Sequence, residues 1–307
     1  MSRSWSERVK RRFAPAVSAG VAVGRDYVGF AQLAANGGGG RLRTLTETKL
    51  DVPLFTGAPS AQAATTLINA LKEFRKSFSA RYAPVHVSLP DAAVRFTVFE
   101  LRDLPKTPAA QLELVKFRLG REGGTAPGAV ACQPLGSEGE RHLLLGLSCD
   151  AGWRELVSDA LAQAGIVGWS MSANVCRQFN RFHDRLTKTA GALVSIAPDA
   201  WSLCLWDADG RVRYVRAHWR TGGEDLAEVA IEVERSILGY VNSEPGRTVD
   251  RVYVVGGEET AAVAAALDAR LREPCVRLSA EDGLKLEPTL KHDAHSAASS
   301  LAAALER

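Results

Sequence analysis

The sequence predicts an α/β protein with two lobes, in which the first lobe carries a small α+β insertion. Two observations predict this class. The 307 residues are 46% hydrophobic and 24% charged, which is the composition of a chain that buries a core and does not remain disordered. A unit of strand, hairpin and strand also occurs twice, once after residue 19 and again after residue 191, with a different segment between the two copies.

The first copy begins at Gly20, where short apolar runs separated by glycine and polar turns predict three successive strands. Ser60 is expected to cap a helix that ends near Ala80, because leucine and phenylalanine recur on one face of it. The apolar run before Pro90 predicts a further strand of the same sheet. The expected elements are strands at 20–24, 27–33, 41–52 and 85–89 and a helix at 61–80.

The elements of the insertion and the second lobe are predicted in the same way, from the spacing of apolar residues and from turn residues. The insertion at 92–149 predicts a strand at 94–101, a helix at 109–119 and strands at 129–134 and 142–149. The chain then returns to the first lobe with a helix at 153–164, a strand at 166–171 and a helix at 172–186. The second lobe predicts strands at 192–196, 201–206, 212–219, 251–255 and 275–278 and helices at 224–242, 259–271 and 296–305. The predicted organisation is therefore 1–18 as a basic segment, 19–91 with 150–188 as the first lobe, 92–149 as the insertion and 189–307 as the second lobe.

Composition argues against several classes of function. No apolar run approaches the roughly 20 residues of a transmembrane helix. The five cysteines are far apart and never form a C-x-x-C pair, which argues against zinc, an iron-sulfur cluster or a disulfide framework. A net charge of +3 without alternating aromatic and basic residues does not indicate a nucleic-acid partner. We therefore expect a cytoplasmic protein without a metal site.

The first 18 residues are basic and carry Trp5, Val9 and Phe13 at helical spacing. A helix with this pattern would place a narrow apolar stripe beside cationic side chains. The segment is therefore expected either to contact an anionic membrane surface or to pack as a tail on its own domain.

Three glycine-containing or strand-end segments carry a resemblance to a known family: Gly20-Val-Ala-Val-Gly24, Val194-Ser-Ile-Ala-Pro198 and Val254-Val-Gly256-Gly257. They stand where the actin-like ATPases, which have a ribonuclease H-like fold, carry two phosphate loops and an adenosine loop. Together with Val87-Ser-Leu-Pro90 and the 99–119 region, the chain resembles the PilM family of type IV pilus assembly proteins, including its relative in mannose-sensitive haemagglutinin (MSHA) pili. The resemblance covers about residues 19 to 306.

The resemblance implies a nucleotide site, from which this sequence departs. Ala22 and Ser195 stand where the family has metal-organising acids, and Pro198 removes a backbone N–H donor from the second loop. The segment 220–223 is short where the family has a further subdomain, so the resemblance implies a reduced second lobe. We therefore expect a degenerate ATPase without catalytic residues or a bound cofactor, in which ATP binding would depend on Arg25. The residues of the degenerate nucleotide site would be Gly24, Arg25, Asp26, Ser195, Asp199, Gly256 and Gly257.

The resemblance also implies a partner. In the PilM family, a PilN-type inner-membrane protein inserts a short cytoplasmic segment between the first lobe and its insertion. Here Arg95 and Arg102 would suit an acidic peptide, as in other groove-recognition modes. The expected partner-binding residues are Val94, Arg95, Phe96, Val98, Arg102, Leu112 and Val115, with Leu101 and Leu119 beside them.

These expectations together describe a non-catalytic adaptor peripheral to the inner membrane, which binds a PilN-like peptide and also joins the pilus motor ATPase. Two alternatives stay open. One is a weak ATP-binding actin-like ATPase, which would need metal-binding acids in both loops. The other is a GspL-type cytoplasmic component of a general secretion system, a class that normally continues into a transmembrane helix.

Overall fold

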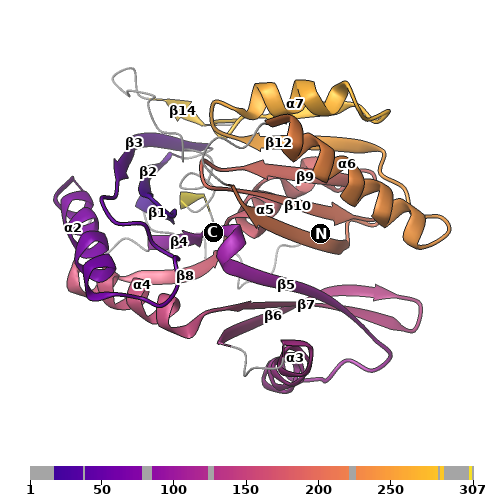
Figure 1. The fold of residues 1–307 in the computed structure, drawn as a ribbon, viewed down its shortest axis with the longest axis horizontal. Helices are drawn as coiled ribbons and strands as arrows, with labels where there is room; N and C mark the ends of the chain where they lie inside the picture. The colour runs from indigo at the N-terminus through magenta and orange to yellow at the C-terminus, as the bar shows by residue number, and fades with distance from the viewer. Residues whose placement is uncertain are drawn as a thin grey trace.

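The computed structural model describes residues 17–36, 39–77, 85–123, 128–220, 226–282, 284–286 and 304–305. Two central sheets and a smaller third sheet form the two lobes and the insertion (Figure 1). The first-lobe sheet has the order β14-β3-β2-β1-β4-β8 and the second-lobe sheet the order β11-β10-β9-β12-β13. The predicted two-lobed fold with an inserted α+β unit is confirmed.

The first lobe consists of a sheet with two helices on its outer face (Figure 1). Ser60 accepts a hydrogen bond from the Ala63 N–H at 3.1 Å, as the predicted cap requires. The strands are β1 (Val17–Val23), β2 (Tyr27–Asn36), β3 (Gly39–Lys49), β4 (Val85–Leu89) and β8 (Gly168–Ala173), and the helices are α2 (Ala61–Ser77) and α4 (Ala151–Gln163).

The second lobe repeats this plan with a five-stranded sheet. Its strands β9 and β12 are parallel, and β10 and β11 continue the sheet as antiparallel neighbours. The elements are β9 (Gly191–Ile196), β10 (Ala200–Trp206), β11 (Val212–Trp219), α6 (Leu226–Ser243), β12 (Arg251–Gly256), α7 (Thr260–Asp268) and β13 (Cys275–Leu278).

The insertion has its own three-stranded sheet, in the order β5-β7-β6, and its own core. A short 3-10 turn, η1 (Asp91–Ala93), leads into it from β4. Helix α3 covers the sheet at the lower end of the molecule in Figure 1. The elements are β5 (Val94–Leu101), α3 (Pro108–Gly123), β6 (Ala129–Glu138) and β7 (Arg141–Cys149).

Helix α5 (Asn174–Leu186) lies between the two lobe sheets and closes their shared core. On β9, Leu193 faces this shared core, whereas Val194 faces α6 and α7. Strand side chains alternate between two faces, and both faces are covered here, so every residue of β9 and β10 is buried. The layer order is therefore α2 and α4, first sheet, α5, second sheet, α6 and α7.

The chain end differs from the predicted boundary. A short strand, β14 (Lys285–Leu286), pairs in parallel with β3, and the Ser18 hydroxyl donates to the Ala304 carbonyl at 2.6 Å. The predicted second-lobe range 189–307 thus contributes a strand to the first-lobe sheet. The 1–16 part of the basic segment and most of the predicted 296–305 helix lie outside the described residues. Among the described helices, none is long and apolar enough to cross a membrane.

Candidate functional site

The first predicted phosphate loop is the β1–β2 hairpin, and its own side chain fills the space beside it. Tyr27 follows the turn at Arg25 and Asp26, and its ring is buried against Gly24. The Gly24 N–H donates to the Tyr27 carbonyl at 2.9 Å, which closes the hairpin. Burial, with neighbouring carboxylates including Asp199, raises the pKa of Tyr27 well above its ordinary value. The hairpin is therefore packed with protein atoms.

The second predicted loop, between β9 and β10, reaches across to the first. The Asp199 carboxylate accepts a hydrogen bond from the Arg25 backbone N–H, so a side chain of the protein itself binds the N–H of this hairpin. The other Asp199 oxygen is buried and has no hydrogen-bond partner among the described atoms. Burial, only partly offset by the hydrogen bond from Arg25, raises the pKa of Asp199 to about 6.

A second buried aspartate, Asp91, links three parts of the chain. Its carboxylate accepts from the Val175 N–H of α5 at 2.8 Å and from the Ser202 hydroxyl of β10 at 2.7 Å. Burial raises the pKa of Asp91 to about 7, although both hydrogen bonds act in the opposite direction. Ser195 lies nearby and accepts from the Asn174 side chain at 3.1 Å. Asp91 therefore joins the entrance of the insertion to both lobes.

The third predicted loop, Gly256-Gly257, lies tightly against the second. A Cβ at Gly256 would be 2.3 Å from the Ile196 carbonyl oxygen, so only glycine fits there. The Arg220 guanidinium, itself buried, binds both the Ala197 carbonyl and the Glu259 carboxylate before α7. This clamp ties the second loop to the start of α7.

Little space remains between these loops. The cavity bounded by both hairpins has a volume of about 10 Å³, which is room for about one water molecule. Among the described residues, no group of three or more His, Cys, Asp or Glu side chains could hold a metal ion. The structure thus brings Gly24, Arg25 and Asp199 together, leaves Asp26 exposed in the turn, and places Ser195, Gly256 and Gly257 in close packing. The three loop positions are thus held together by packing and hydrogen bonds of the chain itself.

A larger cavity of about 210 Å³ opens where the first lobe, the insertion and the second lobe meet. We call it the aromatic groove, because Phe55, Trp153 and Trp219 form much of its wall. The Phe55 ring lies 4.9 Å from that of Trp153 and 6.2 Å from that of Trp219, measured between centroids. The remaining lining residues are Gly57, Leu89, Ala93, Cys149, Asp150 and Arg154.

Local structure fixes the aromatic side chains. Asp150 caps α4 by accepting from the Trp153 N–H at 3.0 Å, and the Trp153 indole donates to the Gly57 carbonyl at 2.8 Å. Phe55 has a φ of 58°, a left-handed conformation that a bulky residue rarely adopts. Held strain of this kind concentrates at binding and catalytic sites. The groove is therefore a preformed apolar site with the exposed Arg154 at its rim.

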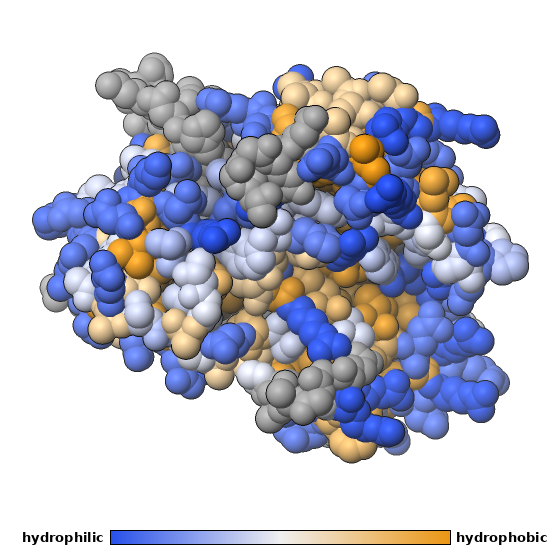
Figure 2. All heavy atoms as spheres, in the orientation of Figure 1, coloured by the Kyte–Doolittle hydropathy of each residue, from blue (hydrophilic) through white to orange (hydrophobic). Residues whose placement is uncertain are grey.

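None of the predicted partner-binding residues lines this groove. Val94 follows the groove residue Ala93 and packs against the first-lobe core. Phe96 and Val98 pack against the core between the lobes, and the apolar side chains along this junction above β5 are visible in Figure 2. The other predicted residues divide between the insertion core and the surface: Val115 and Leu119 are buried with Leu101, Leu112 is half-buried, and Arg95 and Arg102 are exposed.

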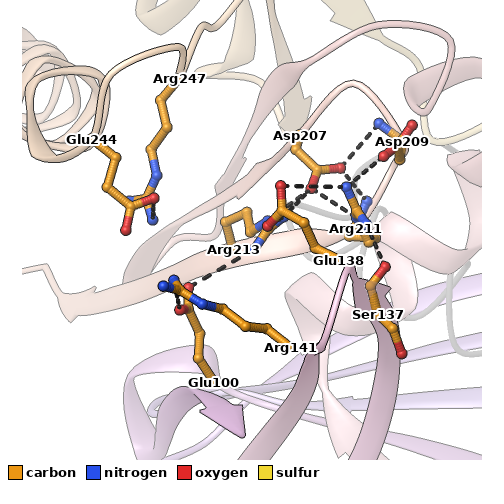
Figure 3. Close-up of polar contacts among 10 residues, drawn as sticks. All are labelled: Glu100, Ser137, Glu138, Arg141, Asp207, Asp209, Arg211, Arg213, Glu244 and Arg247. Carbon is orange, nitrogen blue, oxygen red and sulfur yellow. Dashed lines mark hydrogen bonds and ion pairs between the residues drawn. The ribbon is translucent and has the colours of Figure 1, made fainter. Parts of the chain in front are cut away.

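An ion cluster fixes the insertion against the second lobe (Figure 3). Arg213 of β11 donates to Asp207 of its own hairpin at 2.7 Å and to Glu138 of β6. Glu100 of β5 lies 3.9 Å from Arg213 and 3.2 Å from Arg141 of β7. The Asp207-Ala-Asp-Gly210 segment is a hairpin turn whose carboxylates bind arginine. The cluster thus ties β5 and β6 of the insertion to β11 of the second lobe.

Sequence reasoning did not find the aromatic groove. Its three aromatic residues come from three distant segments, and no spacing in the sequence relates them. Trp153 and Trp219 looked like ordinary helix and strand residues. Phe55 lies in the turn segment after β3, and its positive φ cannot be predicted from the residue type.

Comparisons with known proteins bear on the fold. No protein-family model matches the chain, and no curated protein sequence does. Among solved structures, the chain is similar to one described as a PilM-PilN type IV pilus biogenesis complex, with a TM-score of 0.75 and 17% identity over 94% of this chain and 97% of that one.

Two further structures have the same fold at lower similarity. A Bacteroides thetaiotaomicron protein with an actin-like ATPase fold aligns at a TM-score of 0.55 and 11% identity, over 90% of this chain and 94% of that one. The cytoplasmic domain of EpsL, an inner membrane component of the Vibrio cholerae type II secretion system, aligns at a TM-score of 0.50 and 12% identity, over 90% of this chain and 87% of that one. The chain therefore has the actin-like ATPase fold.

Proposed function

We propose that this chain is a non-catalytic adaptor of a type IV pilus-type assembly machine, which binds the cytoplasmic segment of a PilN-like inner-membrane protein in the aromatic groove. One contrast carries the proposal. The space between the phosphate-loop positions is filled by Tyr27 and Asp199, whereas the groove at the edge of the insertion is open and apolar. A scaffold needs its docking surface intact and does not need a nucleotide site.

The similarity to a solved PilM-PilN complex supports this choice of partner. An extended peptide could place one apolar side chain among Phe55, Trp153 and Trp219, and an acidic residue could reach Arg154 at the rim. Arg95 on β5 is exposed on the same strand that leads away from the groove. Membrane contact through residues 1–18, a link to the motor ATPase and service in an MSHA-type pilus are further parts of the proposal.

Calorimetric titration of the full chain with a synthetic peptide of the PilN-like cytoplasmic segment tests it. Trp219→Ala is expected to weaken binding about tenfold or more, since a buried aromatic anchor is worth about 2 kcal/mol or more. Trp169→Ala is the matched control, because Trp169 is 73% exposed on β8 and does not line the groove. Equal affinities for the two variants would place the partner elsewhere.

A second candidate is a cytoplasmic component of a type II secretion machine, favoured by the similarity to the EpsL domain. The two candidates differ in the membrane protein that is bound. Titration with the cytoplasmic segments of a PilN-like and of a secretion-type partner under the same conditions distinguishes them.

A further inference from the structure

Two buried aspartates bridge the lobes and are connected through short stretches of chain to walls of the aromatic groove. Asp199, on the second lobe, binds the Arg25 N–H of the first-lobe hairpin. Asp91, at the end of the first-lobe strand β4, binds the Ser202 hydroxyl of the second lobe. The lobes are thus joined by two carboxylates that meet N–H and O–H donors across the junction, and each is at least nine-tenths buried.

The connection from Asp91 to the groove is only two residues long on each side. Leu89 and Ala93 flank Asp91 in sequence, and both line the groove. The intervening chain is the 3-10 turn η1, which is closed by the Ala93 N–H donating to the Pro90 carbonyl at 3.0 Å. A displacement of Asp91 therefore moves the groove wall directly.

The connection from Asp199 to the groove runs through Arg220. The Arg220 N–H donates to the Asp199 carbonyl at 2.8 Å, and the preceding residue is Trp219, the second-lobe wall of the groove. Trp153, which also lines the groove, belongs to the first lobe. The width of the groove is therefore set by how the two lobes are held together.

We propose that Asp91 and Asp199 form an internal latch that holds the lobes in the arrangement in which the aromatic groove is formed, so that partner binding at the groove is controlled from the lobe junction. This rests on the proposed function of the groove. Burying a carboxylate is costly unless it accepts hydrogen bonds, and each of these carboxylates accepts one from the opposite lobe.

Cys149 provides a readout of the groove that needs no ligand. Its thiol is free and half-buried, and it lines the groove. Cys132 and Cys275 are also free but do not line the groove, and Cys204 is buried in the core shared by the lobes. Pulse alkylation of the full chain with iodoacetamide, followed by peptide mass spectrometry, gives a separate rate for each cysteine.

Asp199→Ala removes the carboxylate, and we expect it to raise the alkylation rate of Cys149 about tenfold, while Cys132 and Cys275 change less than about twofold. Asp184→Ala is the matched control, since Asp184 is exposed near the C-terminal end of α5, whereas Asp91 binds the N-terminal end of that helix at Val175. If Cys132 and Cys275 also become reactive in Asp199→Ala, that variant is unfolded, and Ser202→Ala, which removes only a hydroxyl, takes its place. An unchanged Cys149 rate in a folded latch variant would overturn the proposal.

Peptide binding separates this proposal from the proposed function. If the latch is correct, the PilN-like peptide binds Asp199→Ala about tenfold more weakly than wild type, because the groove is formed in a smaller fraction of the variant molecules. A peptide that binds neither protein in the groove contradicts the proposed function, while the alkylation rates still decide the latch. A peptide that binds both equally, with unchanged Cys149, contradicts the latch alone.

Discussion

The ring of Tyr27 lies so close to Gly24 that no side chain fits at residue 24. A Cβ built there would be 2.1 Å from the Tyr27 Cε1 atom, well inside van der Waals contact. Both residues belong to the hairpin that the family resemblance identifies with a phosphate loop. The hairpin is thus specialised for packing an aromatic ring, and this has direct consequences for stability and ligand binding.

We first expect Gly24→Ala to lower the free energy of unfolding by about 1–3 kcal/mol, because the added methyl group must displace the Tyr27 ring in a packed core. Gly239→Ala is the matched control. Gly239 lies inside α6 and no other atom lies within 4 Å of the place that its added methyl group would take, so the same substitution should stabilise the protein by about 0.5–1 kcal/mol. Urea denaturation followed by circular dichroism measures both, and shifts of equal sign would contradict the packing.

Next, the purified chain is expected to hydrolyse no ATP and to show no magnesium-dependent thermal shift. The cavity between the hairpins holds about one water molecule, and Ala22 lines it without offering an oxygen ligand. Tyr27→Ala enlarges the cavity but supplies no acid, so it should not restore hydrolysis. Phosphate release and melting temperature with and without magnesium are the measurements. A rise of several degrees that chelation abolishes would show that nucleotide binds.

The third prediction concerns pH. The pKa of Asp91 is about 7 in the folded chain and near 3.8 in an unfolded one, so the folded state binds more protons between these values. The free energy of unfolding should therefore fall as pH rises from about 4 to 7, and Asp199, with a pKa of about 6, acts in the same direction. The loss attributable to Asp91 is on the order of 3–4 kcal/mol.

Asp91→Asn tests this dependence while keeping both hydrogen bonds, since its oxygen can accept from Val175 and its NH₂ can donate to Ser202. The variant should match wild type near pH 4 and exceed it in stability at pH 8. Denaturation midpoints across this range provide the comparison. Parallel curves for the two proteins would mean that Asp91 does not carry the effect.

Much of the fold was readable from the sequence, because strand alternation and helix periodicity are local. The paired hairpins and the Ser60 cap were both predicted from residues next to one another. The end of the chain was not, since the pairing of β14 with β3 depends on contacts across more than 240 residues. Loss of the metal acids at Ala22 and Ser195 was visible, but the filling of their space by Tyr27 and Asp199 depends on tertiary packing.

The last prediction concerns the ion cluster that positions the insertion. The Arg213 side chain is only 7% exposed and binds Asp207 and Glu138 from opposite sides of the junction. Arg213→Ala leaves the half-buried Asp207 without this donor, and we expect a loss of about 3 kcal/mol in unfolding free energy. Arg235→Ala is the control, because its pair with Glu232 is exposed on α6 and should be worth less than about 0.5 kcal/mol.

A double-mutant cycle of Arg213→Ala with Glu138→Ala should give a coupling of at least about 0.5 kcal/mol between the second lobe and the insertion. Additive effects would show that the Arg213–Glu138 pair does not couple the second lobe to the insertion.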